Sequence, residues 1–164
     1  MRLALKPDGG RWFDGEVLSL WLGRSAAVVG ALMMVIGALL PWATASVGTI
    51  ATLSRSGVAT GDGWSFIIAA VLGAAIGSFS IRGFTGLGRG VCLLAVGLVA
   101  EVLIGVEFTN VRNTVLSAGG AFFDMGTQEV GAGIYVMAFG AAAIFLGGAN
   151  ELLRHLSRPQ RSLS

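Results

Sequence analysis

Residues 90–108, GVCLLAVGLVAEVLIGVEF, are apolar enough and long enough to cross a lipid bilayer as one helix. About 20 mostly apolar residues span the hydrocarbon core of a membrane. The run contains two charged groups, Glu101 near its middle and Glu107 near its end. Three further segments have a similar composition, at residues 25–42, 64–81 and 131–152. We therefore predict an all-α membrane protein, an antiparallel bundle of four transmembrane helices.

The composition of the whole chain supports a membrane protein. Of its 164 residues, 54% are hydrophobic and 12% are charged, whereas soluble domains have about 25% charged residues. The only cysteine is Cys92 and the only histidine is His155, so we expect no disulfide, no metal site and no cofactor. The net charge of +2 comes from basic residues near the segment ends, which indicates orientation in a bilayer rather than nucleic-acid binding.

The basic residues predict how the chain is oriented. All Lys and Arg except Arg55 and Arg112 lie before the first segment, between the second and third, or after the fourth. The positive-inside rule then places both termini and the short loop RGFTGLGR in the cytoplasm. Basic and aromatic residues at the segment ends are the expected interface anchors: Trp21, Arg24, Trp42, Trp64, Arg82, Arg89 and Arg154.

Three regions follow from these boundaries: a cytoplasmic arm at 1–23, a transmembrane domain at 24–153 and a basic cytoplasmic tail at 154–164. Residues 17, 18, 21 and 22 of the arm are apolar and share one helical face, which favours an interfacial helix beneath the first span. An ordinary topology anchor is the other interpretation of the arm, and the one we prefer. The first span also resembles a signal peptide ending at Ala43-Thr44-Ala45, but its basic arm is unusually long, so we expect the span to be retained.

The two outer loops carry no recognised motif. Residues 46–63 are rich in Thr, Val and Gly and favour a short extracytoplasmic β-hairpin around Arg55-Ser56-Gly57. In the loop at 109–130, Phe122-Phe123 is expected to dip into the outer interface.

Small residues recur at intervals of seven in every segment, which keeps them on one helix face. In membranes such residues allow backbones to approach closely and drive helix association. In the second and third segments the pairs seven apart are Gly73/Ser80 and Gly90/Gly97, while Gly77 forms a four-residue pair with Gly73 and Gly105 lies four residues after Glu101. The expected packing positions are Gly30, Gly37, Gly73, Gly77, Gly97, Gly105, Gly133, Gly140 and Gly147.

Glu101 is the strongest functional candidate, because intramembrane ionisable residues are costly and commonly functional. It is four residues from both Gly97 and Gly105, so we expect it to face a helix contact. Three roles fit: a neutral acid hydrogen-bonded to Ser78, Ser80, Thr44 or a backbone carbonyl, a proton or cation site, or a pairing group for another subunit.

Other motifs predict little chemistry. We expect Glu107 to be a solvated acid within reach of Arg55 and Arg112, and Glu151 and His155 to form a surface pair. The stretch GFTGLGRG at 83–90 lacks the Gly-Lys-Ser/Thr ending of a phosphate loop and follows a membrane helix, so we interpret it as a tight hairpin. No catalytic set is evident, and we predict that the protein is not an enzyme.

Four short motifs carry a resemblance. Pro41-Trp42 ends the first span, Gly61-Asp62-Gly63-Trp64 enters the second, Val106-Glu107 lies late in the third, and Gly133-Ile134-Tyr135-Val136 enters the fourth. Over residues 24–153 this pattern resembles small uncharacterised four-helix membrane proteins common in actinobacteria. The resemblance implies a tetraspan fold in a plasma membrane and no activity, and Glu101 is not part of it. The chain also looks like claudin-type tetraspans in outline, but lacks their paired loop cysteines and their Trp/Gly-Leu-Trp signature.

Two functions remain open at this point. The first is an accessory or scaffold subunit that binds other membrane proteins, or a second copy of itself, through glycine faces and Glu101. The second is a small oligomeric carrier or channel that couples protons or ions to Glu101. The absence of intramembrane cations and of broken helices favours the first.

Overall fold

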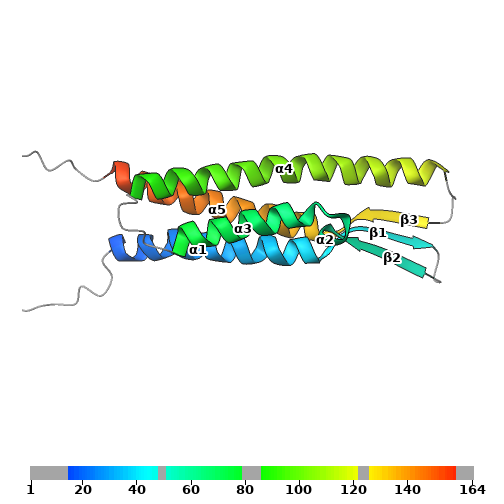
Figure 1. The fold of residues 1–164 in the computed structure, drawn as a ribbon, viewed down its shortest axis with the longest axis horizontal. Helices are drawn as coiled ribbons and strands as arrows, with labels where there is room; N and C mark the ends of the chain where they lie inside the picture. The colour runs from blue at the N-terminus through cyan, green and yellow to red at the C-terminus, as the bar shows by residue number, and fades with distance from the viewer. Residues whose placement is uncertain (1–14, 48–50, 79–85, 122–125, 158–164) are drawn as a thin grey trace, which may run out of the picture.

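The computed structural model of the chain describes residues 15–47, 51–78, 86–121 and 126–157. The elements follow in the order α1 (Gly15–Leu39), β1 (Pro41–Val47), β2 (Ala51–Ser56), α2 (Gly57–Thr60), α3 (Gly63–Ser78), α4 (Gly86–Ala121), β3 (Gly126–Val130) and α5 (Ala132–Leu156). In Figure 1, α1, α3, α4 and α5 run along the long axis of the molecule and the strands lie together at one end. The beginning of α1 and the end of α5 lie at the opposite end.

Three helices are long and apolar enough to cross a membrane, over Trp21–Leu39, Gly86–Asn113 and Ala132–Leu156. The described part of α3 is apolar but has only 16 residues, which corresponds to about 24 Å at 1.5 Å per residue. Helix α1 packs against α5 and α3, and α4 packs against α5 and α3. The prediction of a largely helical chain is therefore confirmed, with three helices that could span a membrane among the described residues; the predicted bundle of four transmembrane helices is not confirmed.

The helix boundaries differ most from the predicted ones at the beginning of α1 and at the end of α4. Helix α1 begins at Gly15 and ends at Leu39, so residues expected in a separate interfacial helix continue directly into the first span. Helix α4 has 36 residues and extends to Ala121, far beyond the predicted end at 108. Polar residues mark where an apolar span ends, but without a proline they do not stop a helix. The extra turns of α4 pack against β1 and β3.

The strands form one antiparallel sheet in the order β2-β1-β3. Thr44 in the central strand pairs with Ser54 on one side and Glu129 on the other. The predicted β-hairpin is confirmed, but its position was wrong: β1 and β2 are joined through residues 48–50, whereas Arg55 and Ser56 lie inside β2. The third strand was not predicted. It pairs with a strand far away in sequence, and five residues, GTQEV, give little local signal. The expected position of Phe122 and Phe123 lies outside the described residues.

Trp42 links the end of α1 to the sheet. The carbonyl of Gly37 would normally accept the amide of residue 41, but that residue is Pro41 and has no N–H. The indole Nε1 of Trp42 donates to this oxygen instead, at 3.1 Å. The Trp42 ring also meets Phe66 edge-on, with centroids 5.8 Å apart. Only 1% of Trp42 is exposed, so its prediction as a lipid-interface anchor was wrong.

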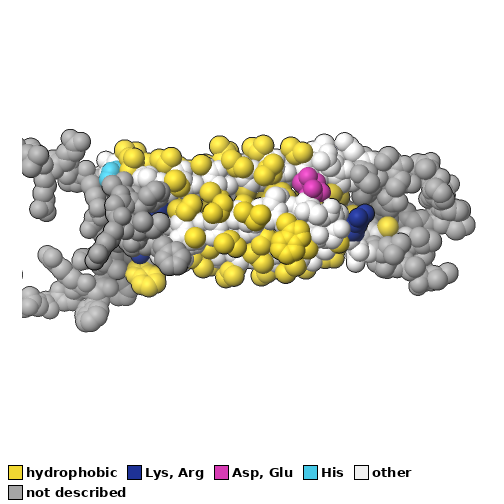
Figure 2. All heavy atoms as spheres, viewed as in Figure 1, with side chains coloured by type: hydrophobic (Ala, Val, Ile, Leu, Met, Phe, Trp, Pro, Cys, Tyr) yellow, Lys and Arg dark blue, Asp and Glu magenta, His cyan; other side chains and the backbone are white. Residues whose placement is uncertain are grey.

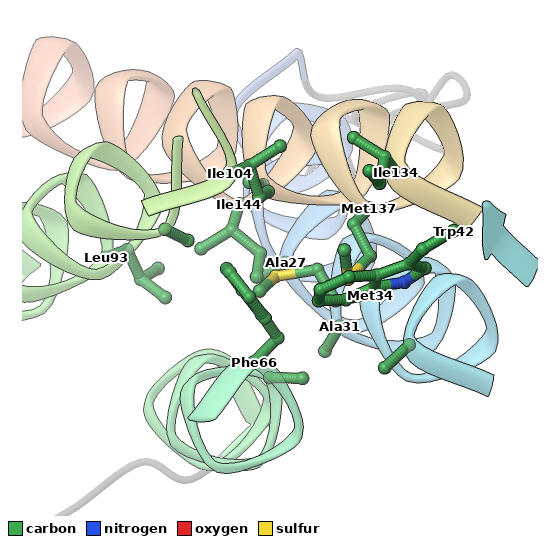
Figure 3. Packing of buried hydrophobic residues seen from close by; sticks show 14 residues of the cluster. Ala27, Ala31, Met34, Trp42, Phe66, Leu93, Ile104, Ile134, Met137 and Ile144 are labelled. Atoms are coloured by element: carbon green, nitrogen blue, oxygen red, sulfur yellow. The ribbon is translucent and has the colours of Figure 1, made fainter. Parts of the chain in front are cut away.

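The core lies between the four long helices, and in Figure 3 its side chains converge from all of them. The largest fully buried side chains are Trp42, Phe66, Met34, Leu93, Ile134, Met137 and Ile144. Outside this core, many large apolar side chains are exposed on all four helices, including Leu32, Ile68, Val102 and Phe139. Figure 2 shows such side chains covering the middle of one face, with charged groups near its two ends. A bilayer would solvate this surface, whereas water would not.

Candidate functional site

Glycines bring the backbones of α1 and α5 into direct contact at three levels. A methyl group on Gly140 would lie 2.5 Å from the carbonyl oxygen of Gly30, and one on Gly133 would lie 2.6 Å from that of Gly37. Further along this α1–α5 contact, which we call the seam, a methyl group on Gly147 would lie 2.7 Å from the carbonyl oxygen of Gly23. Successive pairs are seven residues apart on each helix, so the same faces meet along the whole seam.

Helix α4 uses glycines in the same way against the other side of α5. A methyl group on Gly97 would lie 2.7 Å from the amide nitrogen of Phe145, and one on Gly148 would lie 2.6 Å from that of Leu94. In α3, Gly73 faces Ile144 and Gly77 faces Ala27. These predicted packing glycines therefore hold the chain's own helices together, which leaves them unavailable to a partner.

Gly105 differs from all the other predicted packing glycines. No atom of the described chain lies within 4 Å of the position that its methyl group would take. The expectation that Gly105 contacts another helix is therefore not met among the described residues. Thr109, one turn later on α4, donates its hydroxyl to the Gly105 carbonyl oxygen at 2.9 Å. Glu101, Gly105 and Thr109 therefore form one strip along the surface of α4.

Glu101 lies at the edge of the contact between α4 and α5 and is partly buried. Gly97 and Phe108 share its strip of α4 and both touch α5, Gly97 at Phe145 and Phe108 edge-on at Tyr135 with centroids 6.0 Å apart. Between Tyr135 and Phe145, the sequence of α5 contains no polar side chain. The acid is thus placed beside an apolar helix.

The expected hydrogen-bond partners of Glu101 lie elsewhere. Ser78 is exposed at the end of α3 away from the sheet, Thr44 is in β1, and Ser80 lies outside the described residues. Across the described ranges no hydrogen bond or ion pair reaches Glu101. The expectation that Ser78 or Thr44 bonds to Glu101 is therefore wrong, whereas the expectation for Ser80 stays a prediction.

A cavity of about 470 Å³ lies where the long helices meet the sheet. It is lined by residues of β1, β2, α2, α4 and the α2–α3 connection: Trp42, Ala43, Arg55, Thr60, Asp62, Glu107, Asn110 and Val111. Figure 2 shows acidic and basic side chains near each other at this end of the molecule. Glu107 was expected within reach of Arg55, and both line this cavity. Its mixed charges suit small polar molecules or water rather than lipid chains.

Buried charges occupy the opposite end of the helices. Arg89 Nη2 lies 3.3 Å from Glu151 Oε1, and Arg154 Nη1 lies 4.0 Å from Glu151 Oε2. Arg89 is 8% exposed and Glu151 is 4% exposed. The prediction that Glu151 is a surface residue was therefore wrong, and Arg89 is more than an interface anchor. The i to i+7 spacing of Ile144 and Glu151 could have revealed the buried position.

The remaining predicted anchors differ in exposure. Trp21 is 71% exposed and Trp64 is 56% exposed, as a side chain facing the lipid interface would be. Arg24 is partly buried, and Arg82 lies outside the described residues. Within the described ranges no three His, Cys, Asp or Glu side chains gather as a metal site would require.

No known protein family matches the chain, and no curated protein is significantly similar to it.

Proposed function

We propose that the protein is a non-enzymatic accessory subunit of a plasma-membrane complex, crossing the bilayer four times with both termini in the cytoplasm. In this proposal α3 is the fourth span, and its short length is accommodated by local thinning of the bilayer. The sheet and the cavity beside it face outward. The partner is a transmembrane helix of another protein, which packs on the strip of α4 formed by Glu101, Gly105 and Thr109.

The observation that carries this proposal is the pairing of an unsatisfied acid with an open glycine. Glu101 lies in an apolar span without a polar partner among the described residues, a position that is costly when it faces lipid. Gly105, one turn away, has nothing packed on it, whereas the other predicted packing glycines of the chain are used internally. A partner helix that carries a cationic or hydrogen-bonding side chain would satisfy both residues at once.

Site-specific photo-crosslinking in cells of the native host tests the proposal. A photoreactive amino acid at position 105 is expected to form a covalent adduct with one other membrane protein, and Glu101→Leu should abolish this adduct. The matched position is Val99, which is also exposed on α4 but lies about 120° around the helix from Gly105. Position 99 should yield no such adduct.

A steric variant gives a second measurement. Gly105→Phe should block the close approach of a partner and reduce its recovery in mild detergent roughly tenfold, since overpacking costs about 1–3 kcal/mol. Val99→Phe should leave recovery unchanged. A methyl group at position 105 would meet no described atom within 4 Å, and Val99 is 58% exposed, so both variants should retain their thermal stability.

Several results would contradict the accessory role. An adduct with twice the mass of the chain would identify a second copy as the occupant of the strip. Proton flux through vesicles that contain only the purified protein, abolished by Glu101→Gln, would favour the carrier hypothesis instead.

A further inference from the structure

The charged residues at the end of the molecule opposite the sheet extend the core stripes of their helices. Arg89 precedes the buried Leu93 of α4 by one turn, and Glu151 follows the buried Ile144 of α5 by two turns. Arg24 precedes the buried Ala31 of α1 by two turns. Residues four or seven apart share a helix face. These three side chains therefore point toward the axis of the bundle, and they lie at the end of its apolar core.

Close backbone contacts place the three helix ends together. A methyl group on Gly90 would lie 3.1 Å from the carbonyl oxygen of Gly148, and Gly90 directly follows Arg89. A methyl group on Gly23 would lie 3.6 Å from Glu151 Cγ, and Gly23 directly precedes Arg24. The cluster is therefore assembled by the packing of α1, α4 and α5.

Positive charge exceeds negative charge in this cluster. Arg24, Arg89 and Arg154 supply three guanidinium groups, and Glu151 is the single carboxylate paired with any of them in the described part of the chain. Both Arg24 Nε and Arg89 Nε are buried without a hydrogen-bond acceptor. Glu151 Oε1 lies 3.3 Å from Arg89 Nη2, but the two atoms are not aligned for a hydrogen bond. Buried polar groups are rarely left in this state, and an anion with several oxygens would satisfy them.

The depth of the cluster specifies the kind of anion. Arg24 and Arg89 lie three residues inside the beginnings of their apolar spans, Trp21–Leu39 and Gly86–Asn113, and Arg154 lies two residues before the end of Ala132–Leu156. These positions correspond to the level of lipid headgroups, where arginine side chains between helices bind anionic lipids. Trp21, which is 71% exposed beside them, suits the same interface.

We propose that Arg24, Arg89 and Arg154 bind the phosphate group of an anionic phospholipid at this end of the bundle. The phosphate oxygens accept hydrogen bonds from the guanidinium groups that Glu151 leaves unsatisfied. Glu151 keeps Arg89 and Arg154 oriented when the lipid is absent. The inference requires the chain to lie in a bilayer, but it does not rest on the accessory role, because the lipid binds to the isolated protein.

Lipid-dependent stability of the purified full-length protein tests this site. The probes are dioleoyl phosphatidylglycerol and dioleoyl phosphatidylcholine, added at equal mole fraction to detergent micelles, and inorganic phosphate alone. Phosphatidylglycerol should raise the unfolding temperature more than phosphatidylcholine does. Native mass spectrometry should show phosphatidylglycerol retained in preference to phosphatidylcholine.

Arginine variants locate the effect. Arg24→Gln leaves both ion pairs of Glu151 intact and should weaken phosphatidylglycerol binding roughly tenfold, as expected for loss of a charge-assisted hydrogen bond. Arg55→Gln removes the same charge at the sheet end and should have no effect. Should Arg24→Gln fail to fold, Arg154→Gln serves as a second variant, with a side chain that is 15% exposed.

Three outcomes would overturn the proposal. Equal stabilisation by the two lipids would remove the selectivity for an anionic headgroup. Full stabilisation by inorganic phosphate would identify a site for a soluble anion rather than a lipid. Equal losses in Arg24→Gln and Arg55→Gln would indicate a general effect of net charge.

Discussion

The seam between α1 and α5 gives the sharpest test of the packing, through the substitution Gly140→Ala. The new methyl group would lie 2.5 Å from the Gly30 carbonyl oxygen and 2.8 Å from the Met34 amide nitrogen. Both atoms belong to backbone, so no side chain can rotate away and α1 must move outward by about 1 Å to reach ordinary contact distance. Such overpacking costs about 1–3 kcal/mol.

The clash is with backbone atoms, so the overpacking cost lies in the upper half of its range, about 2–3 kcal/mol. An opposing contribution reduces this cost. Alanine favours a helix over glycine by about 0.5–1 kcal/mol, so we expect a net loss of about 1–2.5 kcal/mol in the free energy of unfolding. For a chain of this size that corresponds to a fall of roughly 2–10 °C in Tm. Thermal unfolding in detergent, followed by tryptophan fluorescence, measures it.

Gly105→Ala is the matched control, because it adds the same methyl group at a helix position where no described atom lies within 4 Å of it. The helix preference of alanine is then unopposed, and Tm should stay unchanged or rise. Equal shifts of Tm in Gly140→Ala and Gly105→Ala, or a higher Tm in Gly140→Ala, would refute the close backbone contact of α1 and α5.

Three further predictions concern the sheet end, the buried charges and the orientation. Trp42→Phe removes the indole donor of the Gly37 carbonyl and should destabilise the protein by about 1–3 kcal/mol; a shift within 0.5 kcal/mol would show that the bond contributes little. Glu151→Leu leaves Arg89, which is 8% exposed, without its carboxylate and should cost about 3–5 kcal/mol, whereas Glu129→Leu on an exposed strand position should change stability by less than about 0.5 kcal/mol. In a Cys92→Ala background, a membrane-impermeant thiol reagent applied to intact cells should label a cysteine at position 54 but not one at position 157, and the reverse pattern would invert the proposed orientation.

Local sequence was sufficient to locate the helices, because apolarity is a property of each segment alone. The run at 131–152 corresponds to α5 at Ala132–Leu156, and the seven-residue glycine pattern marked positions that do form helix contacts. The same local criterion failed at the helix ends. At 109–121 the polar residues ended the apolar run while the helix continued against the sheet.

The contacts between segments far apart in sequence could not be predicted from local apolarity. Gly105 lies four residues from Glu101 and eight from Gly97, so the sequence places it on their side of α4. No described atom lies within 4 Å of the position that its methyl group would take, because the face that α4 presents to α5 depends on the register of the two helices. Glu151 appeared to be an acid at a helix end, but α4 brings Arg89 to it and buries both.

The sequence by itself determined that long apolar helices with glycine-lined faces form, since hydropathy and helical periodicity are set residue by residue. Only the tertiary structure decided which glycines meet, that β3 joins β1, that Trp42 turns inward to the Gly37 carbonyl, and that Glu101 is left without a partner in the described chain. Each of these depends on the relative position of segments far apart in sequence, and the free energy of their contact exists only after the helices have packed.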